Sequence, residues 1–84
     1  MNWDRATQKK YDTMITKIPL FHREITKQIV PIKAEENAKS RGSSVIEEGD
    51  VIQAFLSEVP KAFYSMMIRL MDDVGFQHKP YSEK

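Results

Sequence analysis

The chain has 84 residues, of which 30% are charged and 40% apolar, with a formal net charge of +1 at pH 7 and no cysteine. This length fits one domain with a modest core, and the composition is typical of a folded chain. Without cysteine, disulfides, thiolate zinc sites and cysteine-ligated iron–sulfur clusters are excluded. No apolar run reaches the roughly 18 residues of a membrane span, and the acidic start lacks the pattern of a secretory signal. We therefore expect a cytoplasmic protein that does not enter the membrane.

Charge is unevenly distributed along the chain. Residues 1–42 carry nine Lys and Arg against five Asp and Glu, a net +4, whereas residues 43–84 carry four against seven, a net −3. This asymmetry is compatible with head-to-tail self-association or with an acidic partner for the first half. Two solvated helix faces of different charge explain it more simply, and a DNA-binding domain is usually more basic overall.

The first predicted helix covers residues 3–17. Either Asn2 or Asp4 can cap its first turn, because a short side-chain oxygen accepts a free backbone N–H there. The apolar residues recur at spacings of three, four and seven, which places most of them on one thin stripe. They are Trp3, Ala6, Tyr11, Met14, Ile15 and Ile18.

A second, longer helix is predicted over residues 20–41. Pro19 marks its start, because proline disfavours helical geometry in the residue before it and suits the first turn of the next helix. The apolar residues form one stripe of three isoleucines and a second line of smaller residues beside it. The stripe is Ile25, Ile29 and Ile32, and the line beside it is Val30, Ala34 and Ala38.

Pro31 in the middle of this helix permits two interpretations. It either kinks one long helix and leaves the carbonyl of Lys27 unpaired, or it begins a separate helix after a break at residues 29–30. Because no glycine or turn cluster precedes Pro31, we favour the single kinked helix.

Gly42 is expected to end the second helix, because glycine adopts the left-handed geometry just past the last turn without a side-chain penalty. Val45 and Ile46 then form a short apolar step directed into the core. The third helix is predicted over residues 47–58, where three carboxylates in the first turn suit the positive end of the helix dipole.

The fourth predicted helix, residues 61–74, follows Pro60 and has the cleanest amphipathic pattern in the chain. Residues 1–76 are expected to form the folded domain, and residues 77–84, with a proline and several charges, a flexible tail. No internal repeat and no sustained strand alternation is present. Four helices joined by prolines and glycines predict an all-α bundle.

The helix joints carry a pattern of residues. Trp3 stands near the start, a Pro-x-Phe-x-Arg joint runs from Pro19 to Arg23, and a Glu-x-x-Ala-x-x-x-Gly segment holds Glu35, Ala38 and Gly42. This pattern resembles the small domain at the C-terminal end of the B subunit of light-independent protochlorophyllide reductase, which is also found in stand-alone relatives. The resemblance implies a helical accessory domain in which these residues are structural, with none of the catalytic residues of the reductase.

A second resemblance concerns the segment from Ile46 to Val51. It is similar to the end of a histone fold, where a short apolar strand precedes an Asp-Val pair that opens the last helix. This resemblance implies nucleic-acid binding. Pro31 within the long helix, and serines where that fold has arginine and threonine, favour the first resemblance.

The sequence contains no convincing catalytic or metal-binding group. His22 and Glu24 are two residues apart on a helix and therefore point in different directions, and His78 lies in the expected tail. The adjacent acidic pairs diverge around their helices and are better explained as solvated faces and dipole partners. We expect no enzymatic activity and no metal or cofactor.

Arg23 is the first candidate interaction residue. Its planar fork, at the Pro19 joint, is suited to an anion or a partner. The simpler interpretation is a structural salt bridge, to Glu35 or to an acid on a neighbouring helix. Trp3 is likewise interpreted as a lid on the core rather than as a ligand-stacking residue.

The methionine stripe of the fourth helix supplies the other candidates, Met66, Met67 and Met71. Core packing is the plainest interpretation. The alternatives are a surface for a protein partner or for a second copy of the chain, since flexible thioethers adapt to varied surfaces, and a groove for a hydrophobic ligand. We therefore expect a non-catalytic interaction domain that binds a protein or itself as a homodimer, with histone-like nucleic-acid binding as the alternative.

Overall fold

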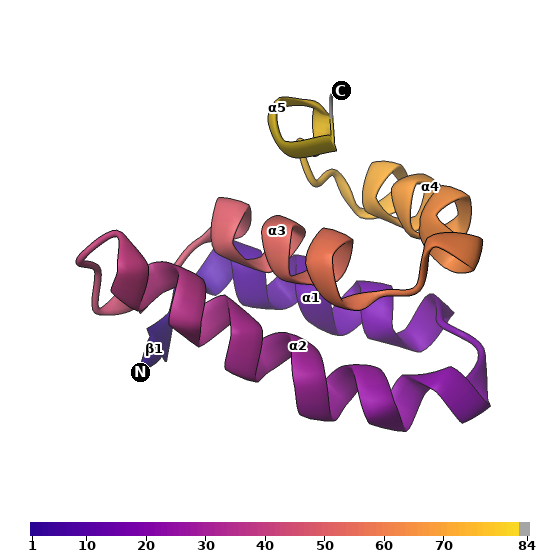
Figure 1. The fold of residues 1–84 in the computed structure, drawn as a ribbon, viewed down its shortest axis with the longest axis horizontal. Coiled ribbons are helices and arrows are strands. Elements are labelled where there is room, and N and C mark those ends of the chain that lie inside the picture. Colours follow the sequence, from indigo (N-terminus) through magenta and orange to yellow (C-terminus); the bar gives the residue numbers. More distant parts are fainter. Residues whose placement is uncertain (83–84) are drawn as a thin grey trace.

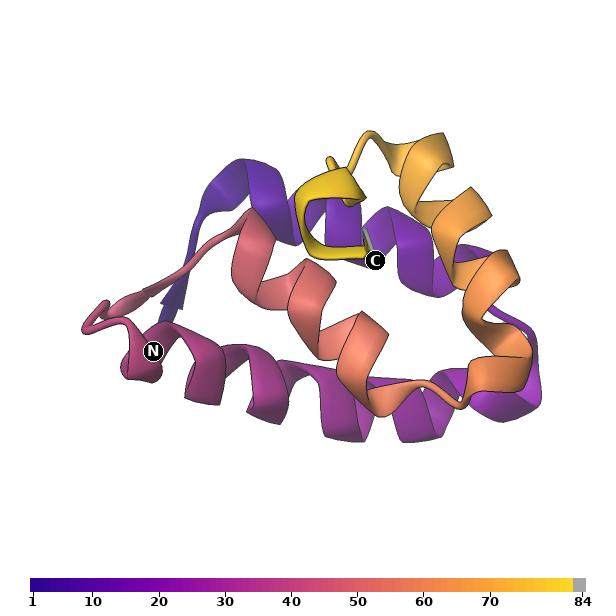
Figure 2. The same ribbon diagram turned by 45° about the horizontal axis from the view of Figure 1, so that its top comes forward.

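The computed structural model describes residues 1–82 and builds them from helices, with a single sheet of two very short strands (Figure 1). In chain order the elements are β1 (Asn2–Trp3), α1 (Arg5–Lys17), α2 (Leu20–Ser40), β2 (Val45–Ile46), α3 (Glu48–Glu58), the 3₁₀ turn η1 (Lys61–Phe63), α4 (Tyr64–Val74) and α5 (Lys79–Ser82). Helix α3 packs along α2, α1 lies behind them, and α4 and α5 lie above (Figures 1 and 2). The predicted all-α bundle is confirmed. Within the described residues, none of the helices combines the length and the apolar character that crossing a membrane requires.

The chain begins as a strand and not as the predicted first turn of a helix. Asn2 pairs with Val45 and Trp3 with Ile46, in a parallel arrangement. The apolar step at Val45–Ile46 therefore has a backbone partner 43 residues earlier in the chain, and this pairing places Ile46 in the core, where it is 1% exposed. A strand of two residues is too short to produce an alternating pattern, so this pairing could not be predicted from the sequence.

Helix α1 starts at Arg5 because Asp4 caps it. The carboxylate of Asp4 accepts hydrogen bonds from the backbone N–H of Thr7 at 3.0 Å and from the hydroxyl of Thr7 at 2.8 Å. Of the two predicted caps, Asp4 is confirmed, whereas Asn2 belongs to β1.

Helix α2 is one continuous helix with Pro31 inside it, so a break at residues 29–30 is wrong. Its end is closed by a paired backbone motif that satisfies two terminal carbonyls. The N–H of Ser43 donates to the carbonyl of Ala38 and that of Gly42 to the carbonyl of Lys39, each at 2.9 Å. Gly42 has φ +74°, the left-handed geometry expected of a helix stop.

The face of α2 that packs into the domain is a line of residues four apart. This line, which is 8% exposed at its first member and at most 1% at the others, consists of Thr26, Val30, Ala34 and Ala38. Helix α2 packs chiefly on α3, and the two alanines let the helix backbones approach closely. The isoleucine stripe is therefore not the packing face, because Ile25, Ile29 and Ile32 are 54%, 38% and 63% exposed.

The core joins all the main helices in a single cluster. Its largest fully buried side chains are Phe55, Met14, Ile18, Ile46, Ile52 and Met71. A row of aromatic rings leads from the edge of the domain into this cluster. The ring centroids of Trp3 and Tyr11 are 5.1 Å apart, and those of Tyr11 and Phe55 are 6.0 Å apart. Half-buried Trp3 thus covers one edge of the core.

The predicted fourth helix is two elements. Pro60 opens the 3₁₀ turn η1, and the regular helix α4 starts only at Tyr64. Helix α4 packs mainly on α1, and Gly75, with φ +87°, ends it in left-handed geometry as expected.

The segment after α4 packs against the start of α3. Phe76 is 2% exposed and His78 8% exposed, and the carboxylate of Glu48 accepts from the N–H of Gln77 at 2.8 Å. Tyr81 of α5 lies over Gly49, so closely that a Cβ there would come within 2.5 Å of the phenol oxygen. Residues 77, 78 and 81 of the expected tail are thus in contact with the helices, and its last two residues lie outside the described part of the chain.

Candidate functional site

Arg23 lies on the first turn of α2 and reaches back to the end of α1. Its Nη2 donates to the carbonyl oxygens of Thr16 at 3.1 Å and Ile18 at 3.0 Å. These carbonyls belong to the negative end of a helix, where a cation is favourable. The expected salt bridge from Arg23 to Glu35 is wrong, because Glu35 pairs with Lys39 one turn further on, at 3.2 Å. The guanidinium is thus engaged in fixing the α1–α2 joint.

A second arginine, Arg41, ties the end of α2 to the start of α3. Its Nε donates to a carboxylate oxygen of Asp50 at 2.9 Å, and its Nη2 donates to the other oxygen. Asp50 also accepts from the N–H of Glu47 at 2.9 Å. Burial alone would raise the pKa of Asp50, but these hydrogen bonds and the charge of Arg41 outweigh burial and hold the pKa below its ordinary value. Asp50 is 2% exposed, so this pair is structural. The sequence indicated that Arg41 suits the negative end of the α2 dipole, but it did not predict the pairing with Asp50.

The three candidate methionines have different environments. Met71 is 0% exposed and Met67 3% exposed, so core packing accounts for both. Met66 is half-buried, and both Met66 and Met67 line a groove between α4 and α2. The structure therefore brings two of these methionines to one site and encloses the third.

Most of the exposed large apolar side chains of the described residues lie on α2. We call Phe21, Ile25, Ile29 and Ile32 the α2 face; they are 80%, 54%, 38% and 63% exposed. Their spacings of four, four and three residues keep them on one side of the helix. Leu20, next to the face, is 71% exposed.

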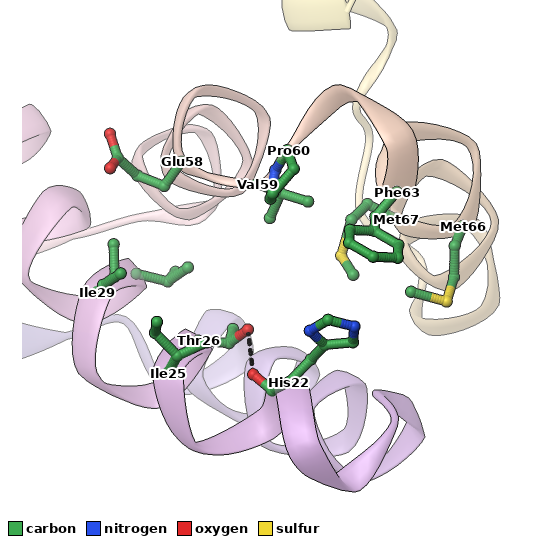
Figure 3. Close-up of a pocket in the computed structure, with 11 residues that line it drawn as sticks. His22, Ile25, Thr26, Ile29, Glu58, Val59, Pro60, Phe63, Met66 and Met67 are labelled. Carbon is green, nitrogen blue, oxygen red and sulfur yellow. Dashed lines mark hydrogen bonds between the residues drawn. The ribbon is translucent and has the colours of Figure 1, made fainter.

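The groove lies beside the α2 face and has a volume of about 250 Å³. Figure 3 shows it between α2 and the segment that leads from α3 into α4. The residues that line it are mostly apolar: Ile25, Thr26, Ile29, Val30, Val59, Pro60, Phe63, Met66 and Met67, with His22 and Glu58 as the ionisable members. The ring of His22 is close to those of both Phe21 and Phe63, with centroid distances of 4.2 Å and 4.5 Å. The groove and the α2 face share Ile25 and Ile29 and form one continuous surface.

A second hollow adjoins the far end of the α2 face. It has a volume of about 230 Å³ and is lined by Ile29, Ile32, Lys33, Glu36 and Glu58. The α2 face is therefore a ridge of apolar side chains with two hollows beside it. Such a shape is complementary to a protein surface that also has a ridge.

The chemistry available in the described residues is limited. They include no group of three or more His, Cys, Asp or Glu side chains that could hold a metal ion. His78 Nε2 lies 2.7 Å from an oxygen of Asp72, a pair that links the segment after α4 to α4 itself, and neither residue is among those that line the groove. Burial raises the pKa of Tyr11 to about 12, so this phenol stays neutral in the core.

The sequence pattern identified the three isoleucines as a stripe on one side of the helix but did not decide which of the two apolar lines of α2 is buried. Helix α2 carries two apolar lines, and a domain of this size buries only one of them. The available signal was the pair of alanines in the second line, because small residues mark the side where two helix backbones come close. His22 and Phe63 gave no signal, since their ring contact joins segments about 40 residues apart.

Comparisons of the chain with models of protein families, with curated proteins and with solved structures found no match. Both resemblances drawn from the sequence therefore stay predictions, and the function of the α2 face has to be inferred from its own geometry.

Proposed function

We propose that the protein is a non-catalytic cytoplasmic interaction domain whose recognition surface is the α2 face together with the groove beside it. One observation carries the proposal: four large apolar side chains are exposed on one side of a helix whose other side is already packed. Contiguous exposed apolar patches on soluble proteins mark interaction sites. A patch of this kind costs solubility, so its presence is best explained by a partner that covers it.

The groove supports a protein partner rather than a small ligand. Its volume of about 250 Å³ is below the usual range for ligand pockets, roughly 300–1,000 Å³. It also opens directly onto the α2 face through the shared side chains of Ile25 and Ile29, so a partner that covers the face covers the groove as well. A large, continuous contact of this kind is typical of protein recognition.

The resemblance to the small domain of a reductase subunit gives the proposal a specific form. It favours an accessory protein that docks onto a larger partner and that has no part in pigment chemistry itself. The local roles of Pro19, Arg23 and Gly42, as helix start, helix cap and helix stop, support the structural role that the resemblance implies for them.

Retention of proteins from a host extract on the immobilised chain tests the proposal. We expect the native chain and the control Gln28→Glu to retain the same proteins, and Ile25→Glu to lose them, because a charge at Ile25 would be desolvated in the contact. Residues 25 and 28 are both exposed on α2, so both variants should fold, which circular dichroism checks. Equal retention by Ile25→Glu contradicts the proposal, and so does the absence of any retained protein if the chain is also a monomer in solution.

A further inference from the structure

The α2 face is symmetrical about its own middle. Its members at positions 21, 25, 29 and 32 have their midpoint near residue 27. If a second α2 helix runs antiparallel across this midpoint, Ile25 of each copy lies opposite Ile29 of the other. Phe21 then lies opposite Ile32 and Lys33 of the other copy. The two central isoleucines thus meet each other directly, and Phe21 meets Ile32 of the other copy to within one residue.

The position opposite Phe21 is concave. Phe21 is the most exposed large apolar side chain of the described residues, at 80%. The hollow beside Ile32 and Lys33, about 230 Å³ in volume, lies as far from the midpoint as Phe21 does, on the other side. A projection and a hollow placed symmetrically about one axis are what an isologous interface between two copies needs.

The size of the surface suits a dimer. The exposed fractions of the four residues of the α2 face together amount to somewhat more than two whole apolar side chains, which is on the order of 450 Å². That is within the range of the largest patch on a typical monomer, about 300–600 Å². With a polar rim it approaches the roughly 800 Å² that each partner buries in a stable interface.

The charges next to the α2 face do not favour a partner with a large net charge. Glu24 and Lys27 lie 3.7 Å apart, and Lys33 and Glu36 lie 3.8 Å apart, so each acid has a base on the same helix. Without a field of one sign, electrostatic complementarity does not favour a strongly acidic or basic partner. A partner surface that also carries equal numbers of acids and bases is the best match, and a second copy of the chain has such a surface.

We infer that the chain forms a two-fold symmetric homodimer in which two α2 helices pack antiparallel through the α2 face and Phe21 of each copy fills the hollow beside Ile32 of the other. This inference rests on the proposed function, because it assigns the recognition surface to a second copy of the chain.

Sedimentation or light scattering of the purified full chain tests the dimer. We expect the mass of two chains at high micromolar concentration, with dissociation on dilution. Phe21→Ala should raise the dissociation constant by more than about tenfold, as truncation of an aromatic anchor that fills a hollow in the partner does. Leu20→Ala is the control: the side chain is as exposed and lies off the α2 face, so its effect should stay below about threefold. The mass of one chain at every concentration, or equal effects of the two variants, would overturn the inference.

Cysteine cross-linking tests the antiparallel geometry, and the native chain has no cysteine to interfere. A mixture of Phe21→Cys and Ile32→Cys chains should form a disulfide-linked dimer on mild oxidation. Each variant alone should not, because equivalent residues would lie about 15–18 Å apart along the helices and a disulfide needs Cα atoms within about 7 Å. Efficient cross-linking of each variant with itself would exclude this arrangement.

The two proposals can fail separately. If the chain is a monomer but retains another protein in a way that Ile25→Glu abolishes, the dimer is wrong and the interaction surface stands. If the chain is a monomer and retains nothing through this surface, both are wrong.

Discussion

Two arginines fix the two ends of α2 through different partners. Arg23 supplies N–H donors to the carbonyls that end α1, and Arg41 holds the buried carboxylate that opens α3. Both therefore fix a joint between helices, and their positions explain why short turns suffice to set the helix directions. The sequence could place Arg23 at its joint, but the partners of both side chains depend on how neighbouring helices meet.

Replacement of Asp50 should make stability depend less on pH. Its pKa in the folded protein is lower than the 3.8 of an unperturbed carboxyl, so the ionised form stabilises the fold above that value. This contribution is lost as the pH falls through the folded-state pKa. Asp50→Asn should lower the free energy of unfolding at pH 7 by about 2 kcal/mol, and the difference from the native chain should shrink towards pH 3.

Urea unfolding at several pH values measures this effect. Asp12→Asn is the matched control, since Asp12 is exposed on α1 and its replacement should leave stability almost unchanged at every pH. A difference between the native chain and Asp50→Asn that stays constant with pH would show that the charge of Asp50 is not what holds the α2–α3 joint.

Truncation of Arg23 should weaken the end of α1. Arg23→Ala removes the donors to Thr16 and Ile18 and should cost about 1 kcal/mol of unfolding free energy. Amide hydrogen exchange should become faster in the last turn of α1 and stay unchanged in α3. If the exchange rates of α1 do not change but partner retention is lost, the arginine acts in recognition and not as a helix cap.

At the scale of elements, α2 shows why periodicity alone cannot locate a core. Both of its apolar lines have helical spacing, and the isoleucine stripe is the more hydrophobic. The smaller line is buried because Ala34 and Ala38 allow α3 to come close. The isoleucines are left on the surface, where they form the candidate site.

Truncation of a side chain in the buried line of α2 should lower the free energy of unfolding more than truncation in the isoleucine stripe. Val30→Ala creates a cavity at a side chain that is 1% exposed and should lower the unfolding free energy by about 2 kcal/mol. Ile32→Ala removes a larger but 63% exposed side chain and should change it by less than about 0.5 kcal/mol. Unfolding at low protein concentration, where association does not contribute, compares them. Equal losses would mean that the isoleucine stripe is also packed.

At the scale of the whole molecule, the charges argue against the histone-like alternative. The net charge is +1, and bases on α2 pair with acids on the same helix, as Lys39 does with Glu35. Nucleic-acid binding needs several cations that are free to displace counterions from phosphates. Val45–Ile46 also pairs with the start of its own chain, so the short strand is already occupied.

Chromatography on heparin tests this point. We expect the chain to elute at low salt, because few of its cations are available to an anionic polymer. Strong retention with a steep dependence on salt would favour nucleic-acid binding. The variant Lys9→Glu, an exposed position on basic α1, would then lower the eluting salt concentration, whereas Ile25→Glu on the apolar face would serve to locate the binding surface.

The sequence by itself determined the helical class and the helix ends at Pro19, Gly42 and Gly75, and it limited the first helix cap to Asn2 or Asp4. These features depend on the backbone chemistry of a few neighbouring residues, and such local effects can be read from the residues in order. Only the tertiary structure decided which line of α2 is buried, that residues 2–3 pair with residues 45–46, and that the segment from residue 76 packs on α3. Each of these depends on segments that are distant in sequence and meet only in the folded chain, because burial and strand pairing are properties of the two surfaces together. The α2 face belongs to this second group: the sequence supplies its isoleucines, and the packing of α3 on the opposite side leaves them exposed.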